Sequence, residues 1–130
     1  MKAIEIKHLS KTYASGTREL TTNDFAVEKG DFAALLGANG AGKTTIISIL
    51  TGLVIKTSGQ VRIFGYDIDK DFIKAKKLIG VVPQEMNLNI FEKPKDILAT
   101  QAGYFGIPRA EAEREAEAGL KRLGLWEKRD

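Results

Sequence analysis

A short glycine-rich stretch holds the residues best suited to chemistry. Residues 37–45 read Gly-Ala-Asn-Gly-Ala-Gly-Lys-Thr-Thr, which fits the phosphate-binding loop pattern G-x-x-x-x-G-K-[ST] at every required position. Glycines let the backbone curl so that successive N–H groups point at one anion. Lys43 adds a mobile cation for the outer phosphates, and the hydroxyl of Thr44 is placed to ligate Mg²⁺. The stretch therefore predicts a binding site for the phosphates of a nucleotide.

The segments on either side of this loop are the ones that such a site needs. An apolar run over residues 32–36 predicts a strand leading into the loop, and residues 46–50 predict a helix that begins near Lys43 and ends near Gly52. The first N–H groups of that helix, and the positive end of its dipole, would face the same anion. Because pattern and context agree, an ordinary turn with an incidental lysine is a poor explanation.

The composition excludes several classes of protein. The chain has 130 residues, a one-domain length, with 43% hydrophobic and 28% charged residues and no cysteine, so disulfides and thiolate metal sites are excluded. The net charge of +3 is dispersed among acidic residues, which gives no support to nucleic-acid binding. An acid at position 5 interrupts any signal peptide, and residues 32–55 contain too many glycines and threonines for a membrane span. We therefore expect a soluble protein.

The rest of the chain predicts a mixed α/β fold. Alternating or continuous apolar residues indicate further strands over residues 3–8, 22–28, 60–64 and 78–82. A short helix is expected from Asp69 or Lys70 to Lys77, with Asp69 as its N-cap.

The last forty or so residues, by contrast, have a helical pattern. Pro94 suits a first helical position, and Gly106 would stop that helix. Pro108 would open the next helix, and Gly124 would end it in the left-handed conformation. The apolar stripe of this second helix is predicted to be Ala112, Ala116, Leu120 and Leu123.

The other residues that could carry chemistry are best explained as surface residues. The single histidine, His8, lies on the polar side of its strand and has no catalytic or metal-binding partner nearby in the sequence. The acids at Asp67 and Asp69 fall in a turn, and those from Glu111 to Glu117 fall on a helix surface. We expect all of them to be solvated.

With these motifs placed, almost the whole chain resembles the N-terminal part of an ATP-binding-cassette (ABC) ATPase, and most closely the ATPase subunits of bacterial ABC-2-type exporters. Three motifs occur in the family's order: Tyr13 matches the aromatic A-loop residue, residues 37–45 match Walker A, and Val-Pro-Gln-Glu at 82–85 matches the Q-loop. Ala38 departs from the proline of many relatives. The resemblance implies a truncated α/β P-loop fold of the ABC ATPase type. About residues 1–90 would form the nucleotide-binding core and an antiparallel β subdomain, and about 91–130 the start of a helical subdomain.

The resemblance also implies a role for each matched residue. Tyr13 would stack on adenine. Lys43 would bind the β- and γ-phosphates, while Thr44 and Gln84 would contact Mg²⁺. Gln84 would also contact the attacking water, which makes it the candidate catalytic residue. The implied contacts to ATP are Tyr13, Gly37, Ala38, Asn39, Gly40, Ala41, Gly42, Lys43, Thr44 and Thr45.

Other family motifs do not follow in the sequence. After Gln84 there is no L-S-G-G-Q-like signature and no apolar strand ending in Asp-Glu, and His8 precedes Walker A, so it cannot be the switch histidine. We therefore expect residues 1–130 to be part of a longer domain and not to hydrolyse ATP alone. For the complete domain, the resemblance implies ATP hydrolysis that drives export through a separate transmembrane permease. It also implies a second ATP-binding subunit as dimer partner and a cytoplasmic location on the inner face of the membrane.

Three alternatives stay open at this point. A non-transport ABC protein acting on ribosomes or DNA would share these motifs, although the dispersed charge does not favour it. A GTPase would share the phosphate loop, but no N-K-x-D sequence for guanine is present and Tyr13 suits adenine. The third alternative is a nucleotide-binding fragment without turnover, which an assay of phosphate release would identify.

Overall fold

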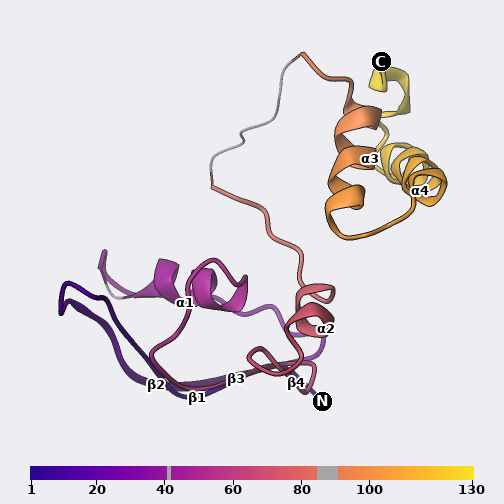
Figure 1. The fold of residues 1–130 in the computed structure, drawn as a ribbon. Coiled ribbons are helices and arrows are strands. Elements are labelled where there is room, and N and C mark those ends of the chain that lie inside the picture. The colour runs from indigo at the N-terminus through magenta and orange to yellow at the C-terminus, as the bar shows by residue number, and fades with distance from the viewer. Residues whose placement is uncertain (41, 85–90) are drawn as a thin grey trace. The chain divides into compact units, whose positions relative to one another are not determined.

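An antiparallel sheet of four strands is the framework of the first of two structural units, Met1–Val81 and Val82–Asp130. The computed structural model describes residues 1–40, 42–84 and 91–130. In spatial order, the strands are β2 (Arg18–Glu28), β1 (Lys2–Thr12), β3 (Ser58–Ile63) and β4 (Tyr66–Asp67). Every neighbouring pair is antiparallel, and β1 lies between its two main partners (Figure 1). The predicted antiparallel β subdomain is therefore present.

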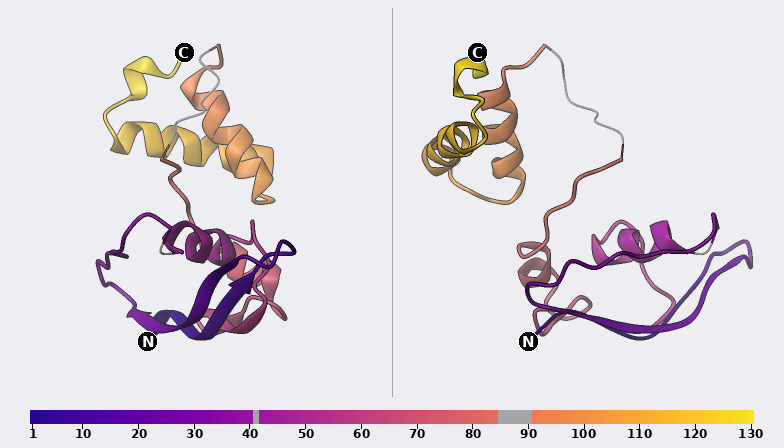
Figure 2. Two further views of the ribbon diagram at one scale, coloured as in Figure 1. Left: turned by 90° about the vertical axis from the view of Figure 1, so that its left-hand side faces the viewer. Right: turned by 180° about the vertical axis from the view of Figure 1, so that it is seen from behind.

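One face of this sheet is apolar and is covered by α1 (Lys43–Leu50), as two views agree (Figures 1 and 2). Alternation along β1 and β3 directs one set of side chains to this face. The buried cluster joins the sheet to α1 and consists of Ile6, Leu9, Leu20, Ile46, Ile49 and Val61. Each such side chain contributes about 1.5–3 kcal/mol when it is removed from water. This cluster holds the start of α1 against the sheet.

β1 continues past its predicted end at His8, and a bulge lies at that residue. The pairing register shifts between Ile6 and Leu9, and His8 has a φ of 51°. The extra residue of a bulge changes which face the following side chains occupy. Leu9 is therefore completely buried, while His8 keeps the surface position that was predicted, with its Nδ1 3.3 Å from a carboxylate oxygen of Asp24.

The prediction of strands at residues 32–36 and 78–82 is wrong, because the described residues there form no strand. Strand N–H and C=O groups need a neighbouring strand, and the described sheet of β2, β1, β3 and β4 includes neither segment. Most of their apolar side chains are accordingly exposed, although Ile79 is half-buried. Phe32 is fully exposed, Leu36 is 88% exposed and Val82 is 92% exposed.

The short helix expected from Asp69 or Lys70 is α2 (Phe72–Lys76), and its N-cap is Asp71 rather than Asp69. Asp69 takes part in a preceding turn, where its N–H donates to Oδ1 of Asp67 at 2.9 Å. Its own carboxylate forms an ion pair of 2.8 Å with Lys56. The helix therefore begins later than the cap pattern predicted.

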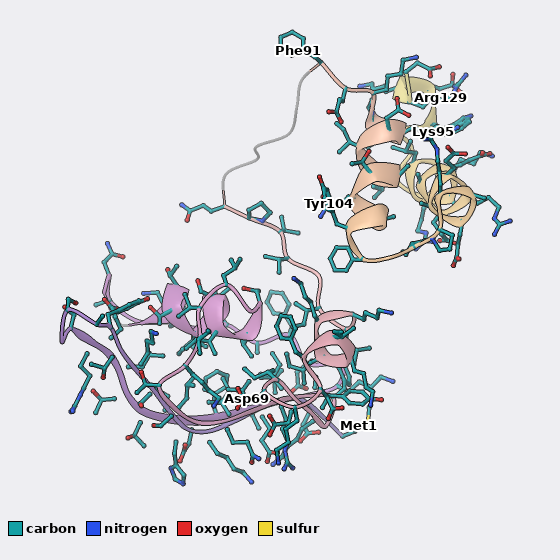
Figure 3. The ribbon with its side chains drawn as sticks, in the orientation of Figure 1. Met1, Asp69, Phe91, Lys95, Tyr104 and Arg129 are labelled. Atoms are coloured by element: carbon teal, nitrogen blue, oxygen red, sulfur yellow. The ribbon has the colours of Figure 1, made fainter. Side chains whose placement is uncertain are left out.

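The second unit is a pair of helices, α3 (Pro94–Tyr104) and α4 (Arg109–Arg122), followed by the short 3₁₀ helix η1 (Trp126–Lys128). Gly106 and Gly124 end the two helices with φ values of 77° and 68°, as predicted. Three residues of the predicted stripe on α4 are buried, but Leu123, at the C-cap, is 70% exposed. The end of the chain is tied to α3 by a bond of 3.4 Å from the N–H of Lys95 to the carbonyl of Arg129 (Figure 3).

In the part of the chain that the structure describes, no helix combines the length and the hydropathy that a membrane span requires.

Candidate nucleotide-binding site

The glycine-rich loop runs directly into the first turn of α1. Gly40 and Gly42 have φ values of 79° and 80°, in the left-handed region that favours glycine. Gly42 is the N-cap of α1, where it provides no side-chain hydrogen bond, and no acidic residue lies in the first turn. A helix start without its own capping group or acid is open to an outside anion. Ala41 lies outside the described residues.

Gly42 also needs to be glycine for a second reason, which is its contact with β2. A Cβ atom at this position would lie 2.2 Å from Cδ2 of Leu20 and 2.9 Å from the carbonyl oxygen of Glu19. Leu20 itself belongs to the buried core. The loop is therefore seated on β2, a support that sequence reasoning missed because twenty-two positions separate Leu20 from Gly42.

The ammonium group of Lys43 lies at the loop rather than in solvent. Its Nζ donates to the carbonyl oxygens of Gly37 and Ala38 at 2.5 and 2.6 Å. Hydrogen bonds from a cation are stronger when the acceptor is also charged. Phosphate oxygens could therefore replace these two neutral acceptors without moving the lysine far.

The two threonines after Lys43 differ in exposure. Thr44 is an exposed residue in the first turn of α1. Thr45 is buried, with 8% of its surface exposed. Among the described residues, no group of three or more His, Cys, Asp or Glu side chains could hold a metal ion. A divalent ion at Thr44 would therefore need ligands from elsewhere, such as phosphate oxygens.

Tyr13 lies where the chain leaves β1 for the turn into β2. Its N–H donates to the carbonyl of Thr17 and its own carbonyl accepts from the N–H of Gly16, both at 2.9 Å. The turn and the glycine-rich loop lie at the same end of the first unit (Figure 1). Tyr13 is 38% exposed, so part of its surface is available for stacking on a base.

Gln84 belongs to the second unit and is an exposed residue in a bend. Glu85, the last residue of the predicted Q-loop motif, lies outside the described residues. The structure therefore brings together the glycine-rich loop, the start of α1 and β2. That Gln84 lies close to these elements stays a prediction.

A glycine-rich loop that enters a helix above a β-sheet, with a lysine at the helix start, defines the class of P-loop nucleotide-binding proteins. Comparison with known proteins gives the family. The family described as ABC transporter matches residues 20–130. The chain therefore belongs to the ABC transporter family.

Individual relatives agree with this assignment. The chain is similar to the linearmycin resistance ATP-binding protein LnrL of Bacillus subtilis, with 36% identity over 125 residues that cover 96% of this chain and 40% of that protein. It is 31% identical to the energy-coupling factor transporter ATP-binding protein EcfA1 of Fusobacterium nucleatum, over 98% of this chain and 49% of that protein. The chain thus spans half or less of these two relatives.

A solved structure confirms the fold prediction. The structure of cbiO1 from Clostridium perfringens, described as part of the ABC transporter complex cbiONQ, superposes with a TM-score of 0.81 and 26% identity. The match covers 99% of this chain and 53% of that one. The predicted α/β P-loop fold of the ABC ATPase type, in truncated form, is confirmed.

Proposed function

We propose that this chain is the ATP-binding portion of an ABC transporter ATPase subunit that, as a complete domain, couples ATP hydrolysis to export through a separate membrane permease. The observation that carries the proposal is the loop at the start of α1, where Lys43 is bonded to two loop carbonyls beside left-handed glycines. Such a loop suits a charged phosphate chain.

The residues present fit a nucleoside triphosphate and its magnesium ion. Backbone N–H groups from Gly40 to Thr44 would hold the β-phosphate, since Gly42 leaves the start of α1 without a side-chain cap. Lys43 would exchange its two carbonyl acceptors for β- and γ-phosphate oxygens. The hydroxyl of Thr44, an exposed residue, would ligate Mg²⁺, which when bound neutralises phosphate charge. Thr45 would reach the α-phosphate.

Two residues outside the loop complete the proposed site. Tyr13, which is partly exposed beside the turn between β1 and β2, would stack on adenine. Gln84 would orient the attacking water and contact Mg²⁺. About residues 1–90 would belong to the nucleotide-binding core and β subdomain, and about 91–130 to the helical subdomain.

The proposed partners are a transmembrane permease and a second ATP-binding subunit, with the protein on the cytoplasmic face of the membrane. The description of cbiO1 as part of a transporter complex supports a permease partner. The name of LnrL, a resistance protein, supports export, because removal of a compound is one way to resist it. No nucleic-acid partner is proposed.

Steady-state phosphate release from MgATP by the full-length protein tests this function. We expect turnover in the wild type, and a loss of about 10²-fold in Gln84→Ala, because a displaced water loses its alignment. Affinity for ATP measured without Mg²⁺ should stay the same in that variant, because Gln84 would contact the nucleotide only through the metal ion. Gln101→Ala, which removes an exposed glutamine of α3 in the same unit, is the control and should behave as the wild type.

Each other outcome removes a stated part of the proposal. Full turnover in Gln84→Ala would exclude its role in hydrolysis. Absence of turnover in the full-length wild type would exclude the ATPase. Residues 1–130 alone are expected to release no phosphate above background, and turnover by that segment would contradict the expectation that the remaining family motifs are required.

A further inference from the structure

Lys11 occupies a position that no nucleotide motif explains. Its Nζ lies 4.8 Å from the centroid of the Tyr13 ring, over the ring face. The same Nζ donates to the carbonyl oxygen of Ile55 at 2.7 Å. A cation at this distance from an aromatic face is attracted by the ring quadrupole. The ammonium group thus connects the Tyr13 ring to the segment that precedes β3.

We infer that Lys11 is a positioning residue for nucleotide binding, which holds one face of the Tyr13 ring and leaves the opposite face for the base. The inference rests on the proposed function, because it requires Tyr13 to be the platform for adenine. Within the nucleotide site, Lys11 would contact the Tyr13 ring and neither the base nor the phosphates. Its effect on affinity would come from keeping the ring in the orientation that stacking needs.

Hydrogen bonds of the residues beside Lys11 hold the platform to the same segment. The N–H of Thr12 donates to Oγ1 of Thr57 at 2.9 Å, and that hydroxyl donates to the carbonyl of Thr12 at 3.2 Å. The N–H of Thr57 donates in turn to the carbonyl of Ser10 at 3.0 Å. Together with the turn bonds that join Tyr13 to Thr17 and Gly16, these contacts hold the backbone on both sides of Tyr13, so the remaining freedom is the rotation of its side chain. Lys11 restricts that rotation.

The contacts also argue against a direct role for Lys11 as a phosphate ligand. The two lysines differ in where their acceptors lie: Nζ of Lys11 is bonded to the segment before β3 and lies over the Tyr13 ring, whereas Nζ of Lys43 is bonded to carbonyls of the glycine-rich loop itself. A ligand that has phosphates but no base separates the two roles. Magnesium tripolyphosphate is such a probe.

The experiment is calorimetric titration of the full-length protein with MgATP and with magnesium tripolyphosphate. Lys11→Met keeps the length of the side chain and removes its charge, and we expect MgATP to bind about two- to fivefold more weakly while tripolyphosphate binds as before. Lys11→Arg should restore ATP affinity, because a guanidinium also stacks on an aromatic face. In the background of Tyr13→Ala, Lys11→Met should cause no further loss.

Lys7→Met is the matched control. Lys7 is also a lysine of β1, but its Nζ lies 3.3 Å from a carboxylate oxygen of Glu5 and its side chain is 55% exposed. Lys7→Met should leave the affinities for MgATP and for magnesium tripolyphosphate unchanged.

Two results would overturn the inference while the proposed function stands: ATP affinity unchanged in Lys11→Met although Tyr13→Ala lowers it, or equal losses for ATP and tripolyphosphate in Lys11→Met. A different result would remove the platform itself. If Tyr13→Ala leaves ATP affinity unchanged, both the stacking role of Tyr13 and the inference fail. Circular dichroism of each variant verifies that the fold is retained.

Discussion

The sequence predicts a strand both in the alternating pattern of β1 and in the wholly apolar residues 32–36, yet only β1 is a strand. β1 has a partner on each side and directs Ile6 and Leu9 into a core where each is at most 1% exposed. Phe32 and Leu36 lie in a segment outside the described sheet. The Phe32 side chain is fully exposed, and that of Leu36 is 88% exposed. Apolar composition therefore predicts a tendency to form a strand, and hydrogen-bonding neighbours decide whether one forms.

The largest expected effect comes from shortening one leucine side chain to alanine in each of the two regions. Leu9→Ala should lower the free energy of unfolding by about 2–5 kcal/mol, because it leaves a cavity in the core. Leu36→Ala should change it by less than about 0.5 kcal/mol, because the side chain is exposed. Urea denaturation of both variants measures the difference. A loss at Leu36 as large as that at Leu9 would show that the segment is covered in the folded protein and would break the comparison.

The features that sequence predicted well are local. The start of α1 at Lys43 and the glycines that end the helices depend on neighbouring residues. Gly52 ends α1 with a φ of 77°, and the N–H of Leu53 donates to the carbonyl of Ser48 at 2.8 Å, as in a Schellman motif. Such positions need a glycine regardless of what packs around them.

The features that sequence missed depend on residues far apart in the chain. Lys11 and Ile55 are 44 positions apart, and no spacing rule connects them. Asp69 failed as the predicted helix cap because it pairs with Lys56, in another part of the chain. The bulge at His8 is a further case, since it follows from how β1 pairs with β2. Propensity and periodicity contain none of this pairing information.

A second prediction compares two glycines of the same loop. Gly42→Ala should lower the free energy of unfolding by about 2–4 kcal/mol, because alanine is strained at a φ of 80° and its Cβ would overlap Leu20. Gly40→Ala has the same strain but open space around the added atom, so we expect about 1–2 kcal/mol. Equal losses in urea denaturation would mean that the loop is not seated on β2.

A smaller effect is expected at the edge of the described sheet, where β4 pairs with β3. The N–H of Asp69, and then the side chain of Gln60, hold the pKa of Asp67 below its ordinary value of 3.8. A carboxyl whose pKa is lower in the folded state stabilises the protein at any pH above its ordinary pKa. This stabilisation is lost as the pH falls through the pKa of the folded state. The melting temperature of Asp67→Asn should therefore fall less than that of the wild type between pH 6 and about pH 2. Identical decreases would contradict these hydrogen bonds.

The central claim is that the loop at the start of α1 binds the phosphates of ATP through Lys43, and calorimetric titration of Lys43→Ala with MgATP tests it most directly. The substitution removes charge-assisted hydrogen bonds and leaves the backbone of the loop intact. Lys29→Ala, which removes an exposed lysine from the turn after β2, is the control. We expect affinity for ATP to fall at least about tenfold in Lys43→Ala and to stay unchanged in the control. Equal affinity in Lys43→Ala and the wild type would contradict the claim.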